Sequence, residues 1–160
     1  MLKITSLCII CGFLFFSSPV KGQNQYNIWY FGDSSGVDFN SGIPVALSNS
    51  SMYAFEGCAV MCDSSGNILF YTNGGDHGAW QGGVWNRNHV LMPNGDLNGF
   101  NGCNSADQSS LIIPAPGNPS LFYLFTLDCI ENGLAGGLRF SIIDMTLDNN
   151  NGDITVKDSL

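Results

Sequence analysis

The residues of this chain that could do chemistry are two histidines, four cysteines beyond position 22, and thirteen acids. A compact zinc site would draw its ligands from cysteine or histidine pairs at short, regular spacing. His77 and His89, with Asp76 beside the first, offer neither a CxxC pair nor an HxxxH pair. We therefore assign no metal ligand and expect both histidines to be surface or loop residues.

An oxygen-rich segment, Asp148-Asn149-Asn150-Asn151-Gly152-Asp153, has the composition of a calcium loop. Calcium binds carboxylate and amide oxygens of this kind at about 2.3–2.6 Å. The EF-hand pattern, however, requires glycine where Asp153 stands. The segment therefore predicts a polar hairpin turn, and we predict no cofactor.

Hydrolysis would require a carboxylate pair acting as acid and base, or a nucleophile beside a histidine. No GxSxG elbow occurs. Asp63-Ser64-Ser65-Gly66 places its glycine one position later than the aspartate box of sialidase propellers does. The acids that could serve are Glu56, Asp63, Asp76, Asp128 and Glu131. Because spacing does not show that any two converge, we assign no catalytic residue.

The charge balance excludes one large class of partners. Lys3 and Lys21 lie in the first 22 residues, where no acid occurs, so the rest of the chain sets 13 acids against three bases and carries a formal charge of −10. Nucleic acids are bound by clustered lysine and arginine, and anionic lipid attracts the same residues. We therefore expect no nucleic-acid partner and no adsorption to anionic membranes.

Residues 1–22 have the three parts of a secretory signal peptide. Lys3 supplies the positive start, Leu7–Phe16 forms the apolar stretch, and Gly22 is the small residue before a predicted cut at Gln23. About ten apolar residues are too few to span roughly 30 Å of hydrocarbon as a helix. We expect a secreted chain, extracellular or on the outer cell surface, without a transmembrane span.

Four cysteines follow the predicted cut: Cys58, Cys62, Cys103 and Cys129. In an oxidising compartment an even count suggests two disulfides, with three possible pairings. The apolar run around Cys58 and Cys62 reads as a strand, which would separate their Cα atoms by about 13 Å, beyond the roughly 7 Å limit for a bridge. We therefore expect any disulfide of Cys58 or Cys62 to join Cys103 or Cys129, the alternative being that some are buried free thiols.

Beyond Gln23, short apolar runs alternate with clusters of Gly, Asn, Asp and Pro, and no helical period is sustained. The turn-rich segment 63–67 predicts a hairpin, 114–119 a longer connection, and the glycine-rich 73–83 a loop. The predicted strands are Asn27–Phe31, Glu56–Cys62, Ile68–Thr72, Val84–Met92, Ser109–Pro114, Leu121–Leu127, Leu138–Leu147 and Ile154–Val156. These features indicate an all-β fold.

A short internal sequence repeat favours a propeller-like array of antiparallel blades. Leu69-Phe70-Tyr71 returns as Leu121-Phe122-Tyr123, an offset of 52 positions within similar strand-turn-strand surroundings. An all-strand repeat near 50 residues is the spacing of propeller blades. Both alternating sets of Leu121–Leu127 are apolar, which suits a blade covered on two faces better than a sandwich sheet with one wet face. A β-sandwich remains the alternative.

Several segments between positions 27 and 147 together resemble a known family. They are Asn27–Gly32, Gly36–Gly42, Phe55–Ala59, Gly66–Thr72, Val84–His89, Met92–Gly95, Gln108–Pro114 and Leu138–Met145. In this order they resemble the N-terminal region of large secreted Bacteroidota proteins that end in a gliding-motility-associated, type IX secretion sorting domain. The resemblance implies a propeller-like N-terminal module of a cell-surface or released protein, and it implies no catalytic residue.

The family's sorting domain has no counterpart here, since the sequence stops at Asp158-Ser159-Leu160. We therefore expect 23–160 to be a propeller-like domain that is truncated at its C-terminus. The function expected is surface adhesion or recognition, with a glycan or a surface protein as the extracellular ligand. The alternative is an extracellular glycan-active hydrolase that uses carboxylates on propeller loops.

The signal-peptide interpretation has a direct test. Export should remove residues 1–22, because the positive start, apolar stretch and small residues end at Gly22. N-terminal sequencing or intact mass of the exported protein should show Gln23 as the first residue. A secreted product that still begins at Met1 would contradict the interpretation.

Overall fold

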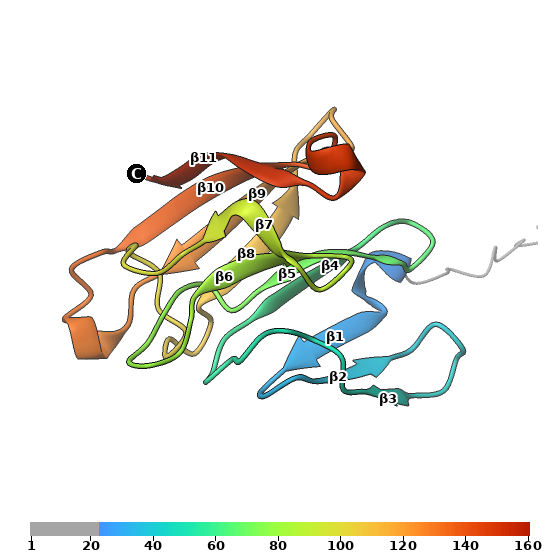
Figure 1. The fold of residues 1–160 in the computed structure, drawn as a ribbon, viewed down its shortest axis with the longest axis horizontal. Coiled ribbons are helices and arrows are strands. Elements are labelled where there is room, and N and C mark those ends of the chain that lie inside the picture. Colours follow the sequence, from blue (N-terminus) through green and yellow to red (C-terminus); the bar gives the residue numbers. More distant parts are fainter. Residues whose placement is uncertain (1–22) are drawn as a thin grey trace, which may run out of the picture.

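The computed structural model describes residues 23–160, and the predicted signal peptide lies outside the described residues. The described chain is all-β, with eleven strands in three antiparallel sheets and three single-turn 3₁₀ helices (Figure 1). The N-terminal sheet contains β1 (Ile28–Phe31), β2 (Ser35–Asp38) and β3 (Val45–Leu47). The middle sheet contains β4 (Ala59–Cys62), β5 (Ile68–Thr72), β6 (Gly83–Asn86) and β7 (Leu91–Asp96). The C-terminal sheet contains β8 (Ser110–Pro114), β9 (Leu121–Leu127), β10 (Leu138–Asp144) and β11 (Asp153–Ser159). The 3₁₀ helices are η1 (Asn24–Tyr26), η2 (Ile130–Asn132) and η3 (Asp148–Asn150).

In every sheet, neighbouring strands are also consecutive in sequence, so each sheet is an up-and-down meander. The turn 63–67 closes the β4–β5 hairpin as predicted. The Asp63 carboxylate accepts hydrogen bonds from the backbone N–H groups of Ser65 and Asn67, at 2.8 and 2.9 Å. Gly66 supplies the positive φ of 88° that this tight reversal needs.

The predicted single strand Val84–Met92 is wrong, because a turn divides it into β6 and β7. The Asn86 side chain accepts hydrogen bonds from the backbone N–H of Asn88 and of Val90, which curls the chain back on itself. His89, inside this turn, has a φ of 61°. Strands β2 and β3 are not among the predicted strands, because their residues are too polar or too few to form an apolar run.

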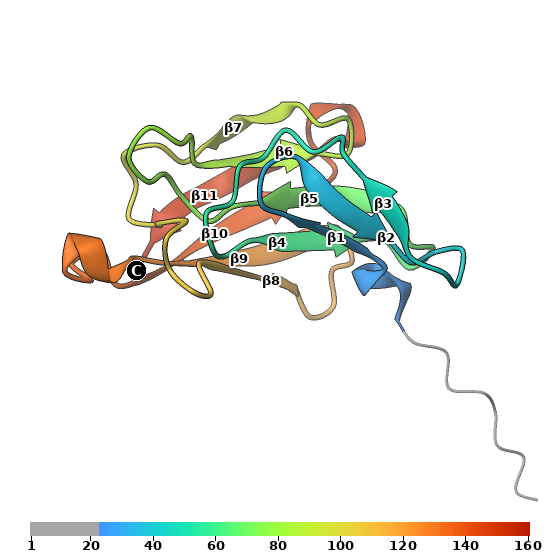
Figure 2. The same cartoon turned by 90° about the horizontal axis from the view of Figure 1, so that it is seen from below.

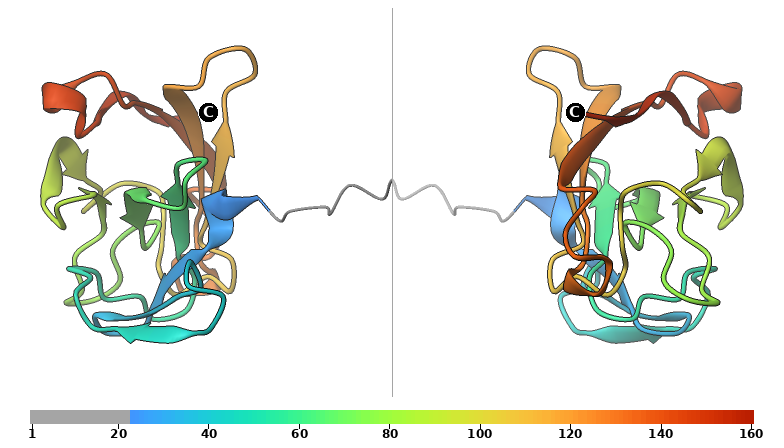
Figure 3. Two further views of the ribbon diagram at one scale, coloured as in Figure 1. Left: turned by 90° about the vertical axis from the view of Figure 1, so that its right-hand side faces the viewer. Right: turned by 90° about the vertical axis from the view of Figure 1, so that its left-hand side faces the viewer.

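The middle sheet is the central layer of the molecule. Met61, Phe70 and Val84 project from one face into a core shared with the C-terminal sheet. Tyr71 and Trp85 project from the other face into a core shared with the N-terminal sheet. Figure 3 looks roughly along the strands and shows the N-terminal sheet, blue to teal, and the C-terminal sheet, orange to red, on opposite sides of the green middle sheet.

The three layers form an open, propeller-like stack rather than a closed ring. Strand β4 lies beside β1 on one side and beside β8 on the other, and the last strands β7 and β11 of the two four-stranded sheets are also in contact. Nothing in the described part of the chain returns to join the C-terminal sheet to the N-terminal sheet. The expectation of a strand covered on both faces holds for β5, where Phe70 and Tyr71 are both fully buried. Strand β9 differs, because only its Phe122, Leu124 and Thr126 face is buried.

The two copies of the internal Leu-Phe-Tyr repeat lie in the second strand of each four-stranded sheet, but they begin one residue apart relative to the start of their strands. Neighbouring propeller blades are related by a simple rotation, so matching residues lie on the same side of their own sheets. If Phe70 and Phe122 matched in this way, only one of the two rings could face the core between the sheets. Instead their rings pack edge to face across the same core, with centroids 5.4 Å apart. Counted from the start of each strand, Phe70 corresponds to Tyr123, which lies on the outward face of β9.

The cysteines form one disulfide in residues 23–160, not two. Cys103 and Cys129 are bonded, with Cα atoms 5.5 Å apart, and the bond ties the β7–β8 connection to the β9–β10 connection. Cys58 and Cys62 are free thiols, which is the alternative that the sequence left open, so the two disulfides suggested by the even cysteine count do not both form. Burial raises the pKa of both free thiols, that of Cys62 to about 11. The physical reason is position, since Cys58 lies just before β4 and Cys62 at its end, both against the N-terminal sheet, where the Cys58 thiol donates a hydrogen bond to the Tyr30 carbonyl.

Loss of the disulfide should destabilise the fold without abolishing it. Cys103 and Cys129 are 26 positions apart, and closing a loop of that size in the unfolded chain is worth about 3.5 kcal/mol. The double variant Cys103→Ser/Cys129→Ser should therefore lower the free energy of unfolding by about 2–4 kcal/mol in urea titrations. Cys58→Ala is the control and should cost clearly less. Equal losses in the two variants would contradict the pairing, as would a linked peptide containing Cys58 or Cys62 in a non-reducing digest.

Candidate functional site

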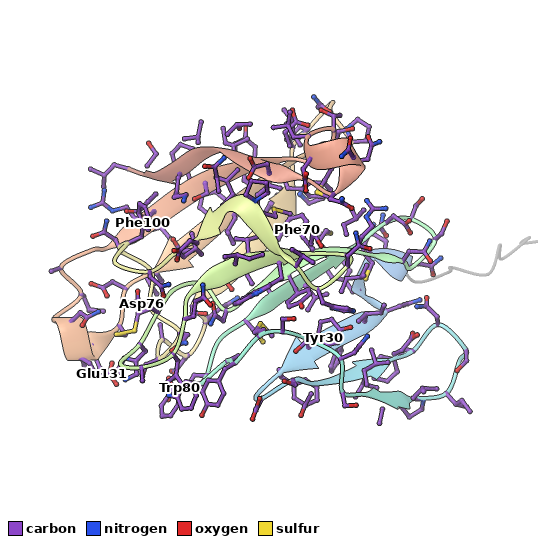
Figure 4. The ribbon with its side chains drawn as sticks, in the orientation of Figure 1. Tyr30, Phe70, Asp76, Trp80, Phe100 and Glu131 are labelled. Carbon is purple, nitrogen blue, oxygen red and sulfur yellow. A yellow bond between two sulfur atoms is a disulfide. The ribbon has the colours of Figure 1, made fainter. Side chains whose placement is uncertain are left out.

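Four long connections gather at one end of the sheets. They are residues 48–58, 73–82, 97–109 and 128–137, which join β3 to β4, β5 to β6, β7 to β8 and β9 to β10. In an up-and-down meander, alternate connections emerge at the same end, so the topology itself brings these four together. This loop end lies on the left in Figures 1 and 2, and Figure 4 shows Asp76, Trp80, Phe100 and Glu131 there.

A stacked aromatic pair lies at the loop end. The rings of Tyr53 and Trp80 stack face to face, with centroids 3.8 Å apart and planes inclined by 10°. The ring of Phe55 lies 5.8 Å from that of His77, which is itself paired through the backbone with Trp80. Trp80 keeps 44% of its surface exposed, so the stacked pair is supported from below and open to solvent above.

A buried asparagine holds the two connections that carry this pair. The Asn73 side-chain amide donates to the carbonyl of Tyr53 at 2.9 Å and to that of Gln81 at 2.8 Å. Its oxygen accepts the backbone N–H of Gly83 at 3.0 Å. All the hydrogen bonds lie inside the protein because Asn73 is fully buried. One side chain therefore fixes the spacing between residues 53 and 81 and positions the aromatic rings.

Close backbone packing fixes the position of the 97–109 connection. A Cβ atom on Gly102 would lie 1.9 Å from the carbonyl oxygen of Gly74, so no larger residue fits there. The Ser109 hydroxyl donates to the carbonyl of Asn73 at 3.0 Å. The loop end is therefore a rigid surface, although it consists of irregular backbone.

Four of the five acids considered as catalytic candidates lie on these connections: Glu56, Asp76, Asp128 and Glu131. Asp63 instead closes the β4–β5 hairpin at the other end of the sheets. Glu131 accepts a hydrogen bond from the Ser105 hydroxyl at 3.0 Å, and Asp76 accepts one from the Gly99 backbone N–H at 3.2 Å. A hydrogen bond from its own backbone N–H, together with that from Ser105, lowers the pKa of Glu131.

Asp128 organises the fourth connection. Burial alone would raise the pKa of this carboxyl, but its hydrogen bonds reverse the effect and lower it. The donors are the backbone N–H of Gly136 at 2.7 Å, the Asn132 amide at 2.9 Å and the backbone N–H of Cys129 at 2.8 Å. The ionised carboxylate thus replaces the backbone partners that the 128–137 connection lacks.

The two histidines have different surroundings. The Nδ1 atom of His77 lies 3.7 Å from the Cys103 sulfur, and the ligand atoms of His77, Cys103 and Cys129 all fall within 4.8 Å of one another. Because the two sulfurs are bonded to each other, neither offers a thiolate to a metal. His89 lies elsewhere, in the β6–β7 turn, where burial lowers its pKa and its ring contacts the Tyr71 hydroxyl at 3.1 Å.

The oxygen-rich segment 148–153 forms the β10–β11 turn, as predicted, and contains η3. The two Asp153 carboxylate oxygens accept hydrogen bonds from the backbone N–H and the side-chain amide of Asn94, at 2.8 and 2.7 Å. The segment therefore links β7 to β11. Among the described residues, no helix has both the length and the apolar character that crossing a bilayer requires.

Comparisons with models of protein families, with curated proteins and with solved structures find no match to this chain. Sequence reasoning missed the Tyr53–Trp80 pair, although a tryptophan inside the glycine-rich segment 73–83 was a usable signal. An aromatic side chain in a loop that cannot bury it is a candidate for a contact surface when a second ring supports it.

The role of Asp128 can be tested through pH. Asp128→Asn keeps the shape but loses the charge that three donors face, so it should lower the free energy of unfolding by about 1–3 kcal/mol at pH 7. The native pKa of Asp128 is lowered, so the stability from its ionised form is present above the unfolded value near 3.9 and fades as pH falls through the native one. Urea titrations at several pH values should therefore show the two proteins converging below about pH 4. A difference that persists unchanged well below pH 4, or an equal loss for the exposed control Asp107→Asn, would contradict this role.

Proposed function

We propose that the chain is a secreted, non-catalytic recognition module that uses its loop end to bind an extracellular glycan. The observation that supports this most directly is the stacked Tyr53–Trp80 pair, with its exposed indole, on rigid connections. A flat aromatic face pairs with the apolar C–H face of a sugar ring, and surrounding polar groups bind its hydroxyls. The amides and carboxylates of the loop end supply such groups.

Pre-organisation supports recognition by this surface. Tyr53 backs the Trp80 ring, and Asn73 holds both of their backbones, so binding requires little further ordering of side chains. Only Trp80 among the stacked rings is open enough to form the contact face. The contact is therefore a small, shallow platform that suits one or two sugar rings.

The charge of the loop end narrows the class of ligand. Glu131 and Asp128 are held ionised by their hydrogen bonds, and Glu56 and Asp76 lie on the same connections. With a formal charge of −10 over residues 23–160, a negatively charged ligand would be repelled. We therefore favour an uncharged glycan over a sulfated, phosphorylated or acidic one.

The alternative is a glycan-active hydrolase, and the four acids at the loop end are the observation that favours it. A hydrolase of this kind needs a general acid whose pKa is raised so that it stays protonated near neutral pH. The pKa values of Glu131 and Asp128 are lowered instead. This is the behaviour of carboxylates that accept hydrogen bonds, which is why binding is the better-supported proposal.

Secretion of the chain, and its place at one end of a larger exported protein, belong to the same proposal. The Cys103–Cys129 disulfide suits an oxidising compartment, and the predicted signal peptide would bring the chain there. The motif resemblance adds that the module would stand at the N-terminal end of a larger exported protein of the gliding-motility-associated type. A ligand-binding face on rigid loops would then serve in cell-surface adhesion.

The test is a comparison of two tryptophans. Trp80→Ala should weaken binding to an array of neutral oligosaccharides on the order of tenfold or more, because it removes the contact face. Trp29→Ala is the matched control, since Trp29 is also exposed, at 55%, but lies on the N-terminal sheet away from the loop end. Equal losses in both variants, or no binding by the unsubstituted protein, would contradict the proposal. Release of reducing sugar from the bound oligosaccharides, lost in Glu131→Gln, would favour the hydrolase.

A further inference from the structure

Three groups that can bind a metal ion meet at the loop end. They are a ring nitrogen of His77 and the sulfurs of Cys103 and Cys129, and these ligand atoms all lie within 4.8 Å of one another. The two sulfurs are bonded to each other, and Figure 4 draws that bond in yellow at the loop end. No short motif marks the cluster in the sequence, because each of the three residues follows the previous one by 26 positions.

The backbone holds the three residues in place without help from the disulfide. His77 exchanges backbone hydrogen bonds with Trp80, at 3.3 and 3.1 Å. The backbone N–H of Cys103 donates to the carbonyl of Leu127 at 3.1 Å, and the carbonyl of Cys129 accepts two backbone N–H groups of its own connection, each at 3.2 Å. None of these bonds involves a sulfur, so the three side chains remain neighbours when the disulfide is reduced.

The spacing of the ligand atoms suits a tetrahedral zinc ion. Zinc binds sulfur at about 2.3 Å and imidazole nitrogen at about 2.0–2.1 Å, so one ligand atom of each kind lie about 3.6 Å apart. The Nδ1 atom of His77 lies 3.7 Å from the sulfur of Cys103. Two sulfurs on one zinc ion lie about 3.8 Å apart, and rotation of the two reduced side chains supplies that separation.

We propose that reduction of the Cys103–Cys129 disulfide turns this cluster into a zinc site. The disulfide takes up two electrons and two protons and becomes two thiols, while a thiol reductant supplies both and leaves as its own disulfide. Zn²⁺ then binds the two thiolates and the neutral imidazole of His77, and the two thiol protons are released. Water takes the fourth position, as it does in zinc sites with two cysteine ligands and one histidine ligand.

The ligand set and the charge of the protein both favour this ion. Thiolate and imidazole suit zinc, whereas calcium and magnesium require oxygen ligands. The formal charge of −10 over residues 23–160 attracts a divalent cation. Both sulfurs are buried and His77 is only partly buried, so the cation reaches the site from the side of the histidine.

Zinc would join more of the loop end than the disulfide does. The disulfide ties the 97–109 connection to the 128–137 connection, whereas zinc also ties the 73–82 connection through His77. The zinc site therefore keeps the loop end together in reducing surroundings, where the disulfide is lost. This inference does not depend on whether the loop end binds a glycan.

The experiment is a zinc titration of residues 23–160 without oxygen, after reduction by a water-soluble phosphine, which takes an oxygen atom from water and leaves as the phosphine oxide. Competition with a coloured chelator should show one zinc ion per reduced chain and none per oxidised chain. Cobalt(II) in place of zinc should give the strong visible absorption of a tetrahedral site with thiolate ligands. His77→Ala should raise the zinc dissociation constant at least about tenfold, since even the loss of an outer partner of a ligand costs about 10–100-fold.

Two matched controls locate the site. His89→Ala removes the other histidine and Cys58→Ala removes a thiol outside the cluster, and both variants should bind zinc as the unsubstituted protein does. Near-UV circular dichroism follows the fold, and a reduced chain that has lost its signal should regain it when zinc is added.

Three results would overturn the proposal. The first is a reduced protein that binds no zinc. The second is a reduced chain whose lost fold zinc fails to restore. The third is zinc binding as tight as that of the unsubstituted protein in His77→Ala or in the double variant Cys103→Ser/Cys129→Ser.

Discussion

The burial of the middle sheet on both faces is the constraint on which the rest of the structure depends. Successive residues of a strand face opposite sides, so Phe70 and Tyr71, both fully buried, require two separate apolar partners. The N-terminal and C-terminal sheets are those partners. Neither of them could support the loop end alone, because the 73–82 connection joins two strands of the middle sheet. Hydrogen bonds of Asn73 hold this connection on one side to Tyr53 and on the other side to Ser109.

Rigidity at the loop end follows from this layered arrangement. The sheets fix where each connection begins and ends, and Asn73 and Asp128 then satisfy the backbone groups that irregular structure leaves unpaired. The stacked Tyr53–Trp80 pair results from that backbone, since its two rings come from different connections and from residues 27 positions apart. Recognition by aromatic stacking and the support of the fold therefore depend on the same buried amide.

The sequence predicted the regular parts of the fold better than the loop end. The strands Ile68–Thr72 and Leu121–Leu127 were predicted with the bounds that the structure has, because each is a continuous apolar run bounded by turn residues. The β6–β7 break was missed because it depends on the Asn86 side chain bonding to backbone, which leaves no gap in the apolar pattern. The cysteine pairing and the aromatic stack were missed because both depend on connections distant in sequence, and spacing within one chain segment carries no record of them.

The free thiols of Cys58 and Cys62 lie along the seam between the N-terminal and middle sheets, where the Cys58 thiol donates to the Tyr30 carbonyl. Burial holds both in the unreactive protonated form, and reagents that attack cysteine need the thiolate. Modification of the buried Cys62 must therefore wait until the two sheets separate, whereas the half-buried Cys58 lines a surface groove and can be reached without that separation. The labelling rate of Cys62 becomes a clock for the separation, and that of Cys58 serves as its reference. In this way one buried thiol measures how often the first layer of the stack detaches from the second.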